Sequence, residues 1–243
     1  MLLLLACSDY EYAKGIDSLD LAGDSARPAD THDTAPADSG PVDTGPEDTA
    51  PDGFEEAYCT PFDDFDGWSY TGTGEWYVED GLLTEGRHGS YAGIAYVGDL
   101  GRSGRFMIQV DTAWTANAND LTGIAWQVNG EEAWVARWDD PQGYYGRYSP
   151  TGGMDLSWCT SGGCTPYVAD SSADLYWPDD KSFVTWSVAV DGDDVAVTVN
   201  GSVVLAATVP GLAGSGPGVV GVYSNDNDGG VWFDNFCVWT GSE

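Results

Sequence analysis

The sequence predicts an all-β domain, an antiparallel sandwich or barrel, and three observations lead to this prediction. From residue 54 onward the chain contains many short runs that are either alternating or wholly apolar, as strands are. Turn signals rich in Gly, Asn and Asp separate these runs at short intervals. The runs show no convincing amphipathic pattern of helical period. Many short strands of this kind are typical of sandwiches and barrels.

The chain begins with an apolar stretch that ends in Ala6 and Cys7, and Ser8 follows. This pattern resembles the lipobox of bacterial lipoproteins, in which a signal peptidase cleaves before the cysteine and the thiol carries a diacylglycerol. Residues 1–6 would then be the remnant of a signal peptide. The stretch is too short to span a bilayer and lacks a positively charged n-region, so we expect that the true start codon lies upstream or that the sequence is truncated. Because Ser8 replaces the aspartate of the inner-membrane retention signal, the resemblance implies the outer membrane or cell surface.

Residues 7–53 are predicted to be a disordered acidic linker. A five-residue unit of the type Asp-Thr-Ala-Pro-Ala repeats four times from Asp33 to about Asp52. Proline at every fifth position prevents both helix and sheet ladders, and the aspartates repel one another. This segment therefore predicts an extended spacer between the lipid and the domain.

The charge of the chain excludes several classes of function. The formal net charge is -32, with 40 acidic residues against 8 Lys and Arg. Such a chain repels phosphate backbones and anionic headgroups, so we expect no nucleic acid partner and no membrane contact except through the lipid. With only 2 histidines, it also offers little for zinc sites or histidine-based triads.

Residues 54–243 form the predicted domain, and its length suits one sizeable core. Asn200-Gly201 between two valine-rich runs predicts a tight hairpin, since a type I′ turn needs positive φ at both positions. The clearest strands are predicted at 91–97, 105–114, 122–128, 133–138, 183–190, 195–200, 203–208, 218–223 and 231–239.

A family resemblance sharpens the fold. Phe65–Trp68 and Gly74–Leu83 resemble the opening of concanavalin A-like lectin/glucanase domains. The phrases at Val195–Val203, Gly218–Tyr223 and Val231–Trp239 resemble their close, in the order seen in laminin-G-like and 3-keto-disaccharide-hydrolase-like members. The resemblance covers nearly the whole domain. It implies a jelly-roll sandwich of two curved antiparallel sheets with the first and last strands adjacent, and we expect a monomer.

Apart from Cys7, four of the 5 cysteines remain, and an even number in an exported chain suggests two disulfides. Three pairings are possible. The jelly-roll resemblance places Cys59, ahead of the first strand, beside Cys237 in the last, which implies a Cys59–Cys237 bridge. Cys159 and Cys164 can then close a tight loop.

A structural calcium ion is a possible cofactor. Asp234 lies inside the last predicted strand between aromatic residues, where an unpaired charge is costly. In several jelly-roll families an aspartate at this position meets acidic residues of the first strand around calcium, and Asp64 and Asp66, with Asp63, could supply them here. The alternative is that Asp234 binds backbone amides or faces water.

No catalytic motif is recognisable in the sequence. Laminarinase-type members carry Glu-x-Asp-x-x-Glu on one strand, and no strand here has that pattern. His88 is the one histidine of the domain and no Gly-x-Ser-x-Gly accompanies it, so we interpret it as an ordinary loop residue.

Aromatic residues are the best candidates for ligand binding. The 11 Trp and 13 Tyr exceed what a sandwich core requires, and flat rings suit the C–H faces of sugars. Alternation places Trp134 and Trp138 on one face of a sheet and Arg137 on the other. If the tryptophans face the core, Arg137 lies on the concave face that this superfamily uses for ligands. We therefore predict a ligand site at Gln127, Arg137, Tyr145, Tyr176 and Trp177, and core packing or loop filling is the alternative for any single ring.

Trp158, Tyr167, Tyr176 and Trp177 are expected in loops rich in glycine and proline. Together these features predict a lipid-anchored surface protein that binds carbohydrate or another extracellular polymer. Two alternatives remain open. One is an enzyme on the same scaffold, a glycosidase or 3-keto-glycoside hydrolase. The other is an adhesive envelope protein that binds a protein partner.

Overall fold

The fold is taken from a computed structural model. It describes residues 50–72, 75–85, 93–101, 103–114, 121–130, 132–139, 151–161, 163–176, 182–212, 215–225 and 231–241. The predicted signal remnant, Cys7 and the linker up to residue 49 lie outside this part of the chain. Among the described residues there is no helix with the length and apolar character needed to cross a membrane.

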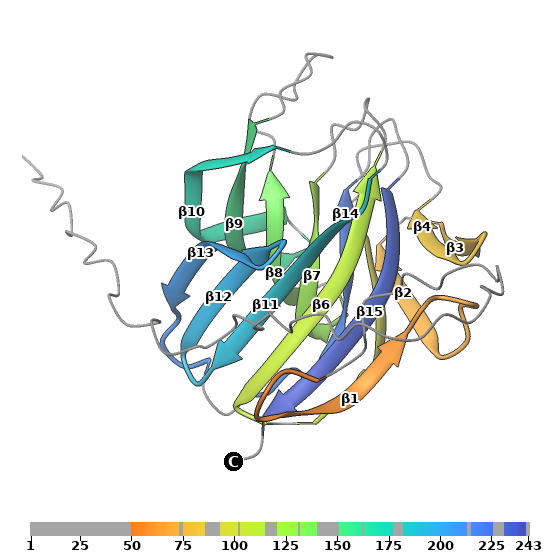
Figure 1. Cartoon of the computed structure of the whole chain (residues 1–243), viewed down its shortest axis with the longest axis horizontal. Helices are drawn as coiled ribbons and strands as arrows, with labels where there is room; N and C mark the ends of the chain where they lie inside the picture. The colour runs from red at the N-terminus through yellow and green to blue at the C-terminus, as the bar shows by residue number, and fades with distance from the viewer. Residues whose placement is uncertain are drawn as a thin grey trace, which may run out of the picture.

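Two antiparallel sheets face each other across one core (Figure 1). The first sheet has the order β13-β12-β11-β6-β15-β4-β3, and β1 pairs with β15 beyond this path. Its strands are β1 (Phe54–Thr60), β3 (Trp76–Glu79), β4 (Leu82–Glu85), β6 (Arg105–Trp114), β11 (Val184–Asp191), β12 (Asp194–Val199), β13 (Ser202–Thr208) and β15 (Val231–Gly241).

The second sheet has the order β10-β9-β8-β7-β14-β5-β2. Its strands are β2 (Trp68–Gly72), β5 (Gly93–Asp99), β7 (Leu121–Asn129), β8 (Glu132–Asp139), β9 (Thr151–Thr160), β10 (Gly163–Tyr176) and β14 (Val219–Asn225). The all-β sandwich of two antiparallel sheets is therefore confirmed. The nine predicted strands correspond to β5–β8 and β11–β15, with ends that differ by a few residues.

Strands β9 and β10 correct the sequence-based expectation of loops at Trp158, Tyr167 and Tyr176. The two strands pair with each other from Gly163↔Thr160 to Tyr176↔Thr151. The sequence predicted a loop here because it contains Pro166, and proline has no backbone N–H to donate to a neighbouring strand. It is tolerated here because β10 is an edge strand, and the register shifts directly after it.

The first and last strands lie side by side, as the jelly-roll resemblance implied. β1 pairs with β15 from Phe54↔Gly241 to Thr60↔Phe236 (Figure 1). Cys59 lies within β1 and not ahead of the first strand, which corrects the expectation. It stands opposite Cys237 in the register and is bonded to it. The second predicted bridge, Cys159–Cys164, is confirmed as well.

The main core lies between the two sheets and is built by the alternate residues of each strand. Trp126, Ile124 and Val222 from the second sheet pack with Trp186, Phe106 and Val188 from the first. Trp138 belongs to this core and Trp134 packs against it, so Arg137 between them is on the opposite face of β8, as alternation predicted. The predicted Asn200-Gly201 hairpin is confirmed, with φ of 48° and 76° at its two positions.

Candidate functional site

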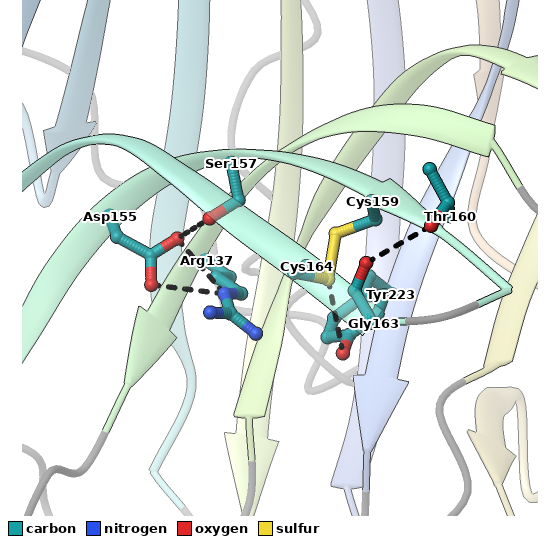
Figure 2. The surroundings of a disulfide bond; sticks show 8 residues. All are labelled: Arg137, Asp155, Ser157, Cys159, Thr160, Gly163, Cys164 and Tyr223. Carbon is teal, nitrogen blue, oxygen red and sulfur yellow. Dashed lines mark hydrogen bonds and ion pairs between the residues drawn. A yellow bond between two sulfur atoms is a disulfide. The ribbon is translucent and has the colours of Figure 1, made fainter.

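Arg137 lies on the outer face of the second sheet, where an ion pair orients it. Its partner in the register is Asp155 of β9. The Arg137 Nε donates to both Asp155 oxygens, at 2.9 Å to Oδ1 and 3.0 Å to Oδ2 (Figure 2). The Ser157 hydroxyl, two residues along β9, donates to Oδ1 of the same carboxylate. All three residues are buried, and hydrogen bonds are stronger in such a low-dielectric environment, so the network fixes the orientation of the Arg137 side chain.

The tip of the β9–β10 hairpin lies over this outer face. Cys164 Sγ of β10 is 3.8 Å from the Tyr223 hydroxyl of β14 (Figure 2). Three strands separate β10 from β14 in the sheet order, a distance of about 19 Å in a flat sheet at about 4.8 Å per strand. The sheet must therefore curl toward its outer face to bring the disulfide loop to Tyr223.

This curl buries an apolar cluster on the outer face that is separate from the main core. The residues of this cluster are buried, and Cys164 of the hairpin packs against them, so the hairpin tip covers part of the outer face of the sheet. The cluster consists of Ile94, Ala125, Val128, Ala133, Val135, Cys159 and Tyr223. The sequence had assigned the disulfide loop only a tight turn, because nothing local in the sequence indicates how far the sheet curls.

Gln127 is placed apart from Arg137. It occupies a bulge in β7, where the register shifts between Trp126 and Asn129, and its φ is 53°. The Gln127 side-chain amide donates to the carbonyl of Gly216 at 3.0 Å. The bulge interrupts the alternation of side chains along β7, and the Gln127 side chain binds the loop before β14. Its role in ligand binding stays a prediction.

The other predicted ligand residues are only partly placed. Tyr176 is the last residue of β10 and its side chain lies outside the described part of the structure, as do Tyr145 and Trp177 entirely. His88 also lies outside it. The strand ends that flank these residues are neighbours, because Asp139 pairs with Gly153 and Tyr176 pairs with Thr151.

A group of aromatic rings, which we call the aromatic strip, runs across the second sheet from β8 to the edge strand β10. It consists of Trp134, Trp158 and Tyr167, from β8, β9 and β10. The Trp134 ring centroid is 5.4 Å from that of Trp158 and 6.0 Å from that of Tyr167, both edge-on. Behind it, Trp126 stacks on Trp134 at 6.5 Å. Trp134 and Trp158 are partly buried, whereas Tyr167 is 39% exposed and donates its hydroxyl to the Thr208 carbonyl of β13.

The predicted calcium residues lie in two parts of the fold, Asp64 and Asp66 in the loop after β1 and Asp234 in β15. Asp64 accepts a hydrogen bond from the Asp66 amide at 3.0 Å, which forms a local turn in the exposed loop after β1. Asp234 instead pairs in the register with Asp111 of β6, and Asn235 donates from its side chain to Asp111 at 2.9 Å. Across the described residues no group of three or more His, Cys, Asp or Glu side chains has a metal-binding arrangement. A calcium ion at Asp234 stays a prediction.

The pKa of Asp234 is nevertheless perturbed. Burial raises it above the ordinary value of 3.8, and repulsion from Asp111 and Asp63 raises it further. The Asn235 backbone N–H, which donates to Asp234 Oδ1 at 2.8 Å, acts in the opposite direction. These carboxylates therefore carry an electrostatic cost that the fold accepts at neutral pH.

No protein-family model matches this sequence, and no curated protein matches it. Solved structures with the same fold include a Bacillus subtilis protein of unknown function with a galectin-like fold, at 13% identity and a TM-score of 0.54 over 78% of this chain and 100% of that one. The catalytic domain of an endo-1,3-beta-glucanase (laminarinase) from Thermotoga petrophila RKU-1 has 10% identity and a TM-score of 0.52 over 78% and 99%. The Emp47p carbohydrate recognition domain has 12% identity and a TM-score of 0.51 over 80% and 100%. The chain thus has the galectin-like, concanavalin-like β-sandwich fold.

Proposed function

We propose that this protein binds carbohydrate through its β-sandwich and that a lipid on Cys7 holds it at the outer membrane or cell surface. The observation that carries the binding proposal is the aromatic strip of Trp134, Trp158 and Tyr167. Flat rings held on a rigid sheet suit the C–H faces of sugar rings. Trp126 behind the strip fixes Trp134, so little side-chain freedom would be lost on binding.

The shared fold supports the same proposal. Among the proteins with this fold, one is described as a carbohydrate recognition domain and another as a laminarinase catalytic domain. The sequence lacks the Glu-x-Asp-x-x-Glu strand of laminarinase-type members, so we favour binding over hydrolysis. Calcium at Asp234 would be a structural addition to this function and is not required by it.

Two surfaces compete for the ligand. The first is the aromatic strip. The second is the end of the second sheet near Arg137, where Tyr145, Tyr176 and Trp177 were predicted to contribute. Asp155 and Ser157 would orient Arg137 for the second surface.

Glycan-array binding of the full chain carrying Cys7→Ser, with calcium and with chelator, tests the proposal. We expect binding to at least one glycan, and Trp158→Ala should weaken it by about tenfold or more, since stacking contributes on the order of 1–2 kcal/mol. Tyr77→Ala is the matched control, because Tyr77 is 42% exposed on edge strand β3 of the other sheet. Weaker glycan binding in Trp177→Ala but not in Trp158→Ala would instead favour the second surface.

Hydrolysis of a chromogenic glycoside without binding to any glycan would overturn the proposal. The anchor is tested separately by fractionation: the chain with Cys7 should sediment with membranes, and the Cys7→Ser variant should be released while the sandwich stays folded. Recovery of both forms in the soluble fraction would contradict the anchor.

A further inference from the structure

Several buried polar side chains gather at one end of the interior between the sheets. They are Trp76, Glu85, Thr122 and Ser224, which we call the interlayer polar cluster. Trp76 is 6% exposed, Glu85 2%, Thr122 1% and Ser224 0%. Neither a binding site nor the proposed carbohydrate function accounts for hydroxyl groups at this depth.

The register places these residues together. Ser224 of β14 stands between Thr122 of β7 and Gly93 of β5. Thr122 and Ser224 point into the core, because Ile124 and Val222, two residues away on the same strands, belong to it. From the first sheet, the Trp76 indole lies above Gly93: a Cβ on that glycine would be 3.1 Å from Trp76 Nε1. Glu85 is the partner of Trp76 in the β3–β4 pair.

Three of these polar groups lack a protein partner. Among the described residues, Trp76 Nε1, Thr122 Oγ1 and Ser224 Oγ are buried without a hydrogen bond to another protein atom. Native proteins pair nearly all such groups, because a buried group left unpaired loses its hydration without compensation. Three unpaired groups in adjacent positions therefore point to a common polar occupant.

The chemistry of the three groups restricts what that occupant is. The indole N–H of Trp76 can only donate, whereas the hydroxyls of Thr122 and Ser224 can donate or accept. The occupant must therefore present an oxygen with lone pairs to Trp76. A metal cation is a poor fit beside an N–H donor, and an anion is a poor fit beside the buried Glu85 side chain.

We propose that the interlayer polar cluster binds one hydroxyl-bearing molecule, whose oxygen accepts from Trp76 and exchanges hydrogen bonds with Thr122 and Ser224. Two sources share this chemistry: a water molecule, which holds the position in the free protein, and a hydroxyl group of a bound saccharide, which takes the place of that water in the complex. The cluster lies where β4 ends and β5 begins, and Ser224 is the penultimate residue of β14. The occupant thus lies one residue from the end of these strands. This inference does not depend on the aromatic strip.

The sign of a stability change tests the proposal. Thr122→Val keeps the shape and removes the hydroxyl. If Thr122 binds an occupant in the free protein, the variant loses a hydrogen bond and its Tm should fall by about 2–4 °C. If the Thr122 hydroxyl has no partner at all, its burial destabilises the folded state, because it loses its hydrogen bonds to water. Replacing it with a methyl group should then raise the Tm. Thr84→Val calibrates the measurement, because Thr84 donates to the Val231 carbonyl at 2.8 Å and is equally buried.

Ser224→Ala is the second variant, and its Tm should also fall. A crystal structure of the full chain should show an oxygen within hydrogen-bond distance of at least two of the three groups. A rise in Tm for both variants, or a cluster whose atoms are dry in that crystal, would overturn the inference. The source is separated by measuring glycan Kd: weakening by Thr122→Val identifies a saccharide hydroxyl, and an unchanged Kd identifies water. The Tm readout needs no glycan, so failure of the carbohydrate proposal leaves it intact.

Discussion

Asp234 illustrates how one side chain depends on a local irregularity. β15 is bulged between Asp234 and Cys237, and Asn235 at the bulge has a φ of 49°. The bulge lets Asn235 reach Asp111 with its side chain and Asp234 with its backbone. Thr185 of β11 donates to the other oxygen of Asp111. Asp111 thus accepts two side-chain hydrogen bonds, whereas the Asp234 carboxylate is destabilised by burial and by repulsion from Asp111.

The raised pKa of Asp234 predicts a pH-dependent effect of Asp234→Asn. A raised pKa in the folded state gives stability that is complete below the ordinary value of 3.8 and is lost as pH rises through the folded pKa. The side-chain amide of the Asp234→Asn variant is uncharged at every pH, so the variant does not lose this stability. Its oxygen can still accept the hydrogen bond from the Asn235 backbone N–H. We expect its Tm to exceed that of the original chain by on the order of 2 °C near pH 7, because solvent screens this half-buried group, and by less near pH 3.

Thermal unfolding in chelator at both pH values measures this difference. Asp66→Asn is the control for the change in net charge, since Asp66 lies on an exposed loop. A lower Tm for Asp234→Asn at neutral pH in chelator would contradict the prediction. Stabilisation of the original chain by calcium, absent in Asp234→Asn, would instead support the predicted calcium site.

For a single residue, the sequence could predict the side of the sheet on which it lies, but not which residues surround it. Alternation correctly put Arg137 opposite Trp138, because side chains change face at every residue of a regular strand. The same rule cannot assign a face to Gln127, since an extra residue at a bulge shifts the pattern. Asp155 and Ser157, which orient Arg137, were missed because they lie 18 and 20 residues away along the chain and meet it only through sheet pairing.

At the scale of the elements, small residues permit the curl of the second sheet. Gly123 of β7 and Gly221 of β14 face outward in the central strands. A Cβ at Gly221 would lie 1.9 Å from the Ala95 carbonyl oxygen, and one at Gly123 would lie 2.2 Å from the Ala136 carbonyl oxygen. Neighbouring strands therefore approach these positions more closely than any side chain allows.

This close approach predicts that Gly221→Ala is severely destabilising. The clash is with backbone, which cannot move without breaking the pairing of β14 with β5. Overpacking costs about 1–3 kcal/mol or more, so we expect the Tm to fall by about 2–12 °C or more. Gly98→Ala in β5 is the matched control, because nothing lies within 4 Å of its added Cβ. Comparable Tm values for the two variants would show that the strands are not held this closely.

The β9–β10 hairpin shows why strands with a weak sequence pattern depend on tertiary contacts to form. Its sequence contains Gly163 and Pro166, which favour loops in isolation. In the molecule, pairing to β8 and the Cys159–Cys164 bridge stabilise it as a hairpin, and its tip covers the apolar outer-face cluster. This context is non-local, so propensity alone could not supply it.

At the scale of the whole molecule, the two disulfides act over very different lengths. Cys59–Cys237 joins residues 178 positions apart and links the first strand to the last. Cys159–Cys164 spans only 5 positions and shapes one hairpin tip. In the chain-entropy view the longer bridge restricts the unfolded chain far more.

We therefore predict unequal losses when the bridges are removed. The long bridge should contribute about 5 kcal/mol and the short one about 2 kcal/mol. The pair Cys59→Ser and Cys237→Ser should lower the Tm by roughly 10–20 °C, and the pair Cys159→Ser and Cys164→Ser by roughly 4–8 °C. Calorimetry of both double variants measures this. Equal decreases would show that strand pairing, and not chain entropy, sets the effect.

Local pattern in the sequence predicted that this chain is rich in antiparallel strands, and it located the clearest strands and the Asn200-Gly201 hairpin. Such features repeat every two residues or sit in adjacent positions, so they can be detected without the fold. The curl that brings Cys164 to Tyr223, the aromatic strip and the polar cluster of Trp76, Thr122 and Ser224 arise only in three dimensions. Each joins strands distant in sequence, and sheet order, register and curvature alone decide which of them meet.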